Sequence, residues 1–172
     1  RTPFRALAMK PFTIWFTGVP GSGKTVLSKL LTSHLRSNGI ACAMLDGYDI
    51  RKRTGDLLGF AASARKVHAV YCAVAAAVLN DSGICVSASF VSPSRDSREE
   101  ARRIVGDERF FEVYLTCKAD LAKARAPNPA WVGIHVSYEE SRQADLQLDT
   151  TDDKPERSVE LVLEMLQERR AI

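Results

Sequence analysis

The 172-residue sequence lacks any apolar run long enough to cross a membrane, and it carries little net charge. A spanning helix needs about 18 consecutive apolar residues, and no segment approaches that length. The first residues also lack the charged-then-apolar pattern of a signal peptide. With 24 basic and 21 acidic residues, the net charge of +3 is too small to indicate nucleic acid or a membrane surface as a partner. We therefore expect a soluble domain that binds neither.

Cysteine is scarce, and its spacing indicates neither a metal site nor a disulfide framework. The four cysteines, Cys42, Cys72, Cys85 and Cys117, are far apart and form no CxxC pair. Cys42 and Cys85 fall in expected strands, Cys117 lies just after one, and Cys72 falls in an expected helix, where a free thiol behaves as a small apolar side chain. We expect reduced, buried thiols and a cytoplasmic location.

Apolar runs alternate with amphipathic segments, which predicts an α/β domain with a parallel sheet between helices. Residues 1–11 have the character of a tail or linker, and residues 12–172 form one domain. The expected strands cover residues 12–17, 40–45, 84–90, 110–115 and 144–148. The expected helices cover residues 23–37, 63–79, 97–105 and a last segment from residue 155. Prolines interrupt residues 120–138, which we interpret as a lid loop.

The most specific motif is GVPGSGKT at residues 18–25, which satisfies the phosphate-binding pattern G-x-x-x-x-G-K-[ST]. It follows an apolar strand and opens an amphipathic helix, as this loop requires. Backbone amides would converge on phosphate oxygens, Lys24 would stabilise the outer phosphates during transfer, and the Thr25 hydroxyl would ligate Mg²⁺. The motif therefore predicts a three-layer P-loop NTPase fold that uses ATP and Mg²⁺. The predicted ATP-binding residues are Gly18, Gly21, Ser22, Gly23, Lys24 and Thr25.

Polar side chains also follow the second and third expected strands. Ligands of such folds bind beyond the carboxyl ends of the parallel strands, so these two segments should face the phosphates. Asp46 or Asp49 could hold Mg²⁺ beside the loop threonine, or take the proton of an acceptor hydroxyl. Arg51, Arg95 and Arg98 could bind an anionic group of the acceptor, because a guanidinium matches phosphate or sulfate oxygens in pairs.

Together with further motifs, these residues resemble the adenylylsulfate kinase family, which moves the γ-phosphate of ATP onto the 3′-hydroxyl of adenylylsulfate. The similarity extends from residue 12 to the C-terminus. The motifs are WFTG (15–18), LDG (45–47), DLLGF (56–60), SFVSP (89–93), KAR (123–125), GI (133–134), YE (138–139) and LDT (148–150). The resemblance implies a five-stranded parallel sheet, ATP with Mg²⁺, a small nucleotide as acceptor, and a homodimer. It also implies a lid in which Trp131 packs on the base of the acceptor.

The resemblance also implies contacts with the acceptor, and several of these positions depart from the family pattern. The implied contacts are Arg51, Phe60, Arg65, His68, Phe90, Ser92, Arg95, Lys123 and Trp131. Tyr48 stands where the family has a second Asp, and Asp49 comes one residue later. His68 replaces an Asn, Ser94 replaces an aromatic residue, and Ser97 replaces an Asp. The changes fall on ligand contacts while the phosphate loop is intact, so we expect the same chemistry with altered ligand details.

Three functions are compatible with this pattern. The first is adenylylsulfate kinase activity. The second is a sister kinase whose acceptor is another nucleotidyl compound with a sulfate-like or phosphoramidate-like group, as in a cytidine diphosphoramidate. The third is a non-catalytic nucleotide sensor fused to a sulfurylase domain. The intact sequence Gly23-Lys24-Thr25 argues against the third, because a sensor does not need the lysine that contacts the γ-phosphate.

Overall fold

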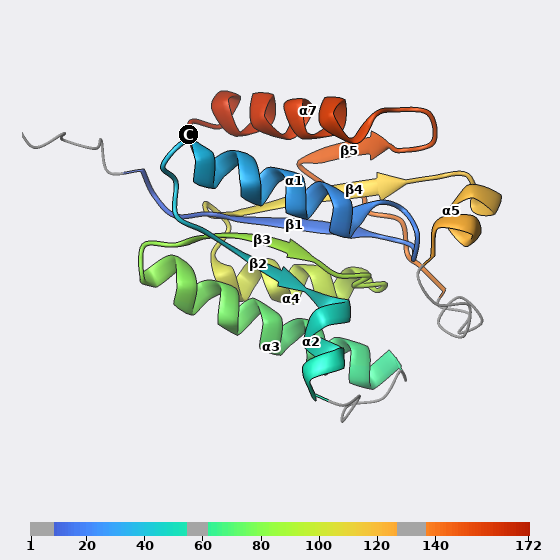
Figure 1. The fold of residues 1–172 in the computed structure, drawn as a ribbon. Helices are drawn as coiled ribbons and strands as arrows, with labels where there is room; N and C mark the ends of the chain where they lie inside the picture. Colours follow the sequence, from blue (N-terminus) through green and yellow to red (C-terminus); the bar gives the residue numbers. More distant parts are fainter. Residues whose placement is uncertain (1–8, 55–61, 127–136) are drawn as a thin grey trace, which may run out of the picture.

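The computed structural model describes residues 9–54, 62–126 and 137–172, and a parallel five-stranded sheet forms its centre (Figure 1). The strand order is β2-β3-β1-β4-β5, and all four neighbouring pairs are parallel. The strands are β1 (Thr13–Gly18), β2 (Cys42–Asp46), β3 (Cys85–Ser89), β4 (Phe110–Thr116) and β5 (Leu146–Asp149). The predicted fold class is confirmed.

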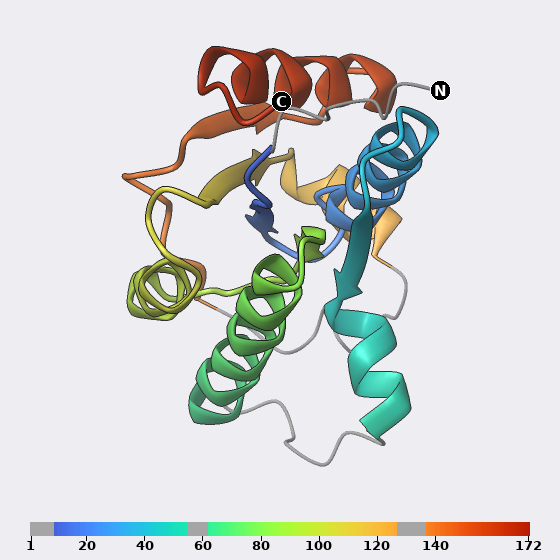
Figure 2. The same cartoon turned by 90° about the vertical axis from the view of Figure 1, so that its left-hand side faces the viewer.

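Helices cover both faces of the sheet, with α1 and α7 on one face and α3 and α4 on the other (Figure 1, Figure 2). The described helices are α1 (Lys24–Ser37), α2 (Gly47–Thr54), α3 (Ala62–Asp81), α4 (Arg95–Val105), α5 (Ala119–Arg125) and α7 (Pro155–Glu168). Side chains along a strand point alternately to opposite faces. Ile14 and Phe16 of β1 therefore join the apolar cluster of α1 and α7, whereas Trp15 joins that of α3 and α4.

Two short helices differ from the sequence prediction. A loop was expected after β2, but residues 47–54 form α2. Asp46 begins this helix, because its Oδ1 accepts hydrogen bonds from the backbone N–H groups of Tyr48 and Asp49 at 2.9 and 3.1 Å. The segment predicted as a lid loop begins with α5. This helix ends just before Ala126, since a residue that precedes proline disfavours helical backbone.

The order of the strands predicts a ligand-binding site at one edge of the sheet. On either side of the central strand β1 lie β3 and β4, and both come later in the chain. Open α/β sheets bind ligands at such a switch point, beyond the carboxyl ends of the strands. The carboxyl ends of β1 and β2 lead into α1 and α2, which meet at the same edge in Figure 1. This edge also receives the phosphate-binding motif.

Three of the four cysteines are buried, as the sequence predicted. Cys42, Cys72 and Cys85 are buried and free, and Cys117 is half-buried. Burial raises the pKa of the Cys72 thiol to about 12, so this thiol is not a nucleophile near neutral pH. Within the described ranges, no group of three or more His, Cys, Asp or Glu side chains is placed to hold a metal ion. No helix in those ranges is both long and apolar enough to span a bilayer.

Candidate active site

The phosphate-binding loop joins the end of β1 to the start of α1 and leaves no room for a side chain at Gly21. This residue has a φ of 81°, in the left-handed region that favours glycine. A Cβ atom there would lie 1.9 Å from the carbonyl oxygen of Ala122, on α5. The glycine is therefore required by its conformation and by the close approach of α5, a helix that comes much later in the chain.

Lys24 turns back into the loop. Its Nζ donates hydrogen bonds to the carbonyl oxygens of Gly18 and Val19, at 3.0 and 2.7 Å, and to Ser22 Oγ at 3.4 Å. The residue is 8% exposed. Burial lowers the pKa of Lys24 to about 7, and the nearby Asp46 carboxylate opposes this only in part. A buried ammonium held by carbonyl oxygens is ready to exchange these partners for the oxygens of an anion.

Asp46 connects three elements at the floor of the site. Its Oδ2 accepts hydrogen bonds from the hydroxyls of Thr25 on α1 and Ser89 on β3, at 2.7 and 2.5 Å. Its Oδ1 binds the first amides of α2, and the residue is 4% exposed. The two residues predicted to hold a metal, Thr25 and Asp46, are therefore in direct contact. They offer the hydroxyl and carboxylate oxygens that Mg²⁺ prefers.

The two carboxylates that the sequence left as alternatives are separated by the structure. Asp46 lines the cavity above the phosphate loop. Asp49 lies on the exposed side of α2 and is not among the lining residues. Tyr48, which occupies the position of the family's second Asp, does line the cavity and is 41% exposed. Asp46 is the single carboxylate among the described lining residues.

The cavity has a volume of about 140 Å³ and brings together most of the predicted site. The predicted site residues that line the cavity are Gly21, Lys24, Thr25, Asp46, Arg51, Arg65, His68, Phe90 and Ser92. It also includes residues that the sequence analysis did not assign, namely Pro20, Gly47, Tyr48, Ser89, Val91, Pro93 and Ala126. Arg95 and Lys123 do not line it. Phe60 and Trp131 lie outside the described residues.

Arg51, Arg65 and His68 line another part of the cavity. Burial, with a further contribution from Arg51, lowers the pKa of Arg65. Burial also lowers the pKa of His68 to about 4, and the charges of Arg51 and Arg65 act in the same direction. The imidazole of His68 is therefore neutral at physiological pH and packs edge-on against Phe90, with 5.7 Å between ring centroids. Two guanidinium groups and a neutral imidazole thus line this part of the cavity, and guanidinium groups are well suited to bind anions.

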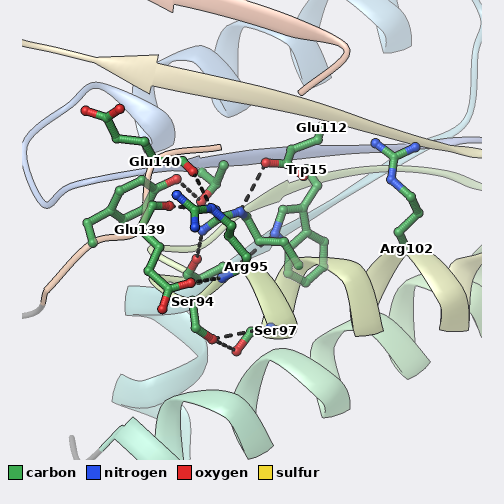
Figure 3. Close-up of polar contacts among 12 residues, drawn as sticks. Trp15, Ser94, Arg95, Ser97, Arg102, Glu112, Glu139 and Glu140 are labelled. Atoms are coloured by element: carbon green, nitrogen blue, oxygen red, sulfur yellow. Dashed lines mark hydrogen bonds and ion pairs between the residues drawn. The ribbon is translucent and has the colours of Figure 1, made fainter. Parts of the chain in front are cut away.

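Arg98 has a different place from the one expected. The sequence analysis grouped it with the anion contacts, but it is 2% exposed and forms an ion pair with Glu112, with 3.1 Å between Nε and Oε1. It does not line the cavity. In Figure 3, Glu139 and Glu140 lie beside Arg95 at the start of α4, and the Glu139 carbonyl accepts a hydrogen bond from Arg98 Nη2 at 2.7 Å. No local motif signals this contact, since Arg98 and Glu139 are far apart in the sequence.

A phosphate loop at the end of a central strand, a carboxylate beside its threonine, and a pair of arginines in the same cavity are typical of a P-loop kinase. The sequence profile of the adenylylsulphate kinase family matches residues 10–149. The chain belongs to this family.

Similar proteins agree with this assignment. A probable adenylyl-sulfate kinase of Halalkalibacterium halodurans is 32% identical over 169 residues, which cover 92% of this chain and 81% of the relative. The adenylyl-sulfate kinase of Prochlorococcus marinus is 36% identical over 168 residues, 91% of this chain and 84% of the relative. Among solved structures, the Mycobacterium tuberculosis APS kinase CysC, in complex with AMPPNP and APS, has a TM-score of 0.84 at 26% identity. That alignment covers 92% of this chain and 98% of the other.

Proposed function

We propose that this protein is an ATP-dependent kinase that transfers the γ-phosphate to the 3′-hydroxyl of adenylylsulfate. The observation that carries the proposal is that one cavity joins a phosphate loop to a pair of arginines. Lys24 and the loop amides suit the triphosphate, whereas Arg51 and Arg65 suit the sulfate or phosphate of a second nucleotide. The similar kinase from M. tuberculosis, solved with AMPPNP and APS, supports the same pairing of ligands.

The reaction would depend mainly on positioning and charge, as in other phosphoryl transfers. Lys24 would bind the outer phosphates and stabilise the charge that develops on the transferred group. Arg51 and Arg65 would hold the acceptor so that its hydroxyl faces the γ-phosphate. Asp46 would orient this hydroxyl and accept its proton, because Asp49 lies outside the cavity. Metal binding and proton transfer, for which the sequence left Asp46 and Asp49 as alternatives, would then both belong to Asp46.

The oxygen donors around the loop fit Mg²⁺. This ion keeps several waters and phosphate oxygens as ligands, and so it needs only one or two protein groups. Thr25 and Asp46 would supply these groups, and their hydrogen bond of 2.7 Å already places them together. When bound, Mg²⁺ would neutralise part of the charge on the triphosphate.

A second candidate is a sister kinase with another anionic nucleotide as acceptor. It is favoured by one specific observation, namely that Tyr48 and His68, two departures from the family pattern, both line the cavity. The neutral His68 ring offers one donor and one acceptor, whereas the expected Asn offers an amide. The acceptor contacts would then differ in detail while the phosphate loop stays the same.

The test is a panel of nucleotide acceptors with ATP and Mg²⁺. We expect adenylylsulfate to exceed every other acceptor in kcat/KM by about 100-fold or more, equal to roughly 2.7 kcal/mol. We expect Lys24→Ala to abolish turnover without a change in the circular dichroism spectrum. A near-normal rate for Lys24→Ala would exclude the loop as the site of transfer. Preference for another acceptor would favour the sister kinase.

We further propose that the protein is a homodimer whose two copies meet at the outer face of α3. An apolar stripe runs along this face, with side chains between 42% and 64% exposed. The stripe consists of Val67, Tyr71, Val74 and Val78. Their spacing places them on one side of the helix. In a twofold-symmetric pair, the stripe of each copy would pack against the stripe of the other, and such a contact is self-complementary.

We also propose a cytoplasmic location, which the three buried free thiols support. Fusion to a sulfurylase domain stays a prediction from the family resemblance.

A further inference from the structure

Residues 91–93, here called the cavity wall, line one side of the active-site cavity. Hydrogen bonds from residues that do not line the cavity hold this segment in place. The Ser92 carbonyl accepts a hydrogen bond from Arg98 Nη1 at 2.7 Å, and the Pro93 carbonyl accepts one from the Glu139 backbone N–H at 2.8 Å. Ser92 has a φ of 40°. This left-handed backbone costs a residue other than glycine about 1–2 kcal/mol. The shape of the wall therefore depends on distant groups that hold it.

All three nitrogen atoms of the Arg98 guanidinium have a partner in this arrangement. Besides the Ser92 carbonyl, it donates through Nη2 to the Glu139 carbonyl at 2.7 Å and pairs through Nε with Glu112 at 3.1 Å. Its Cζ lies 5.1 Å from the centre of the Tyr138 ring. Burying a charged group costs several kcal/mol unless it is paired and hydrogen-bonded. A fork of five donors meets this requirement, and a lysine cannot do so.

Residues 138–140, here called the return segment, are joined to the wall through a second route as well. The Tyr138 hydroxyl and Thr17 Oγ1 lie 2.9 Å apart, and Thr17 Oγ1 donates to the Val91 carbonyl at 2.8 Å. The Tyr138 ring stacks on Tyr114 with 5.5 Å between centroids and 10° between planes. The return segment and the cavity wall thus form one connected unit, and Arg98 lies at its centre.

We propose that Arg98 is a positioning residue for the transfer reaction. It holds the cavity wall and the return segment in one fixed relation, and so it sets the shape of the side of the cavity that receives the acceptor nucleotide. The inference rests on the proposed kinase function. Arg98 touches neither ligand in this account, because it does not line the cavity. The phosphate loop, which would hold ATP, has no contact with it through the hydrogen bonds described above.

The first test is the variant Arg98→Lys, which keeps the charge but loses the planar fork. One ammonium cannot replace the divergent bonds to Ser92, Glu139 and Glu112, so the wall should loosen. We expect the KM for the acceptor to rise by about tenfold or more, whereas kcat and the KM for ATP change by less than about threefold. Steady-state kinetics with each substrate varied in turn would measure the three constants.

The matched control is Arg102→Lys, one helical turn further along α4. Arg102 is also ion-paired, with 2.7 Å between Nη2 and Asp145 Oδ2, and its Nη1 donates to Asp107 and to the Phe110 carbonyl, neither of which belongs to the wall. A general effect of losing a guanidinium on α4 would appear in both variants. We expect the KM for the acceptor to rise in Arg98→Lys alone. An equal rise in Arg102→Lys would overturn the proposal.

Amide hydrogen exchange does not depend on the acceptor, so it tests the positioning role of Arg98 separately from the proposed kinase function. We expect amide hydrogen exchange to increase at residues 91–95 and at 138–141 together in Arg98→Lys, and at neither in Arg102→Lys. Exchange that increases in only one segment, or in neither, would overturn the positioning role. If the joint increase is seen but the wild-type protein phosphorylates no adenylylsulfate, only the proposed function has failed.

A second variant covers the case in which Arg98→Lys does not fold. Tyr138→Ala removes the ring next to the guanidinium and the bond to Thr17 without changing a buried charge. We expect the same pattern, with a higher KM for the acceptor, an unchanged KM for ATP, and faster exchange in both segments. A folded Tyr138→Ala protein with wild-type KM and exchange would contradict the proposal.

Discussion

At the scale of single residues, the two candidate carboxylates can be distinguished by substitution. Asp46 lines the cavity and contacts Thr25 and Ser89, whereas Asp49 is exposed on α2. We expect Asp46→Asn to lower kcat by about 10²- to 10⁴-fold, the usual effect of losing a group that accepts the proton. Asp49→Asn should stay within about twofold of wild type. Steady-state rates at saturating ATP would measure both, and a severe loss in Asp49→Asn would return the catalytic role to that residue.

The buried Lys24 gives a second prediction at this scale, for the dependence of ATP binding on pH. Burial lowers its pKa to about 7, so in the free protein it is mostly charged below pH 7 and mostly neutral above. Bound phosphates favour the ammonium, so binding raises the pKa and takes up a proton. We expect ATP affinity to fall above pH 7, by at most about tenfold per pH unit.

Calorimetry in two buffers with different ionisation enthalpies would measure this proton uptake. The matched variant is Lys24→Arg, which stays charged at every pH tested and should bind ATP with no proton uptake from this side chain. Wild-type binding without proton uptake between pH 7 and 8 would show that Lys24 is already charged in the free protein.

The sequence predicts the phosphate loop residue by residue because its chemistry lies within one contiguous segment. Lys24 and Thr25 follow from the motif, and Asp46 follows from its place at the end of a strand. The role of Arg98 could not be predicted in this way. Its partners Glu112 and Glu139 reach it only through the order of the strands and the path of the chain after them.

At the scale of elements, the contact between α5 and the phosphate loop leads to a comparison of two glycines. Gly21 and Gly39 have nearly equal φ angles of 81° and 78°. A Cβ at Gly21 would collide with the backbone of Ala122, whereas one at Gly39 would meet nothing within 4 Å. Both alanine variants should lose about 1–2 kcal/mol of stability from the backbone conformation. Only Gly21→Ala should also lose ATP binding, because the loop or α5 must move.

Thermal unfolding and calorimetry with ATP would measure the two effects separately. Retained ATP affinity in Gly21→Ala would mean that the loop tolerates displacement of α5. Equal loss of affinity in Gly39→Ala would show that the effect comes from stability alone.

Within the described part of the chain, the two helices that were not expected from the sequence are short and polar. α2 has 8 residues and α5 has 7, too few to show a clear helical period. Isolated helices of this length are unstable in water, so their formation depends on groups outside them. For α2 that group is Asp46, which caps the helix and faces Thr25 at the same time. The sequence showed the carboxylate but not this second role.

At the scale of the whole molecule, the alternation of apolar and amphipathic segments was sufficient to predict a parallel sheet between helices. It could not show which faces stay uncovered. α3 is rich in Ala and Val on every side, a pattern usually found in a buried helix. Its inner face packs in the core through Ala69, Ala73 and Ala76, but its outer face is exposed. Only the placement of the neighbouring helices distinguishes the two faces.

This exposed face gives the prediction for assembly. Stable interfaces usually bury about 800 Å² per partner, more than one pair of helices supplies, so the dimer should be weak and should depend on concentration. A glutamate at Val74, in the middle of the stripe, would be buried against apolar side chains and should leave only monomers. The control Ile172→Glu adds the same charge at another exposed apolar residue and should dimerise like wild type. Sedimentation velocity over a range of concentrations would measure all three proteins. A wild-type protein that stays monomeric at every concentration would show that the stripe binds a different partner. A Val74→Glu protein that still dimerises would show that the dimer forms through a different surface.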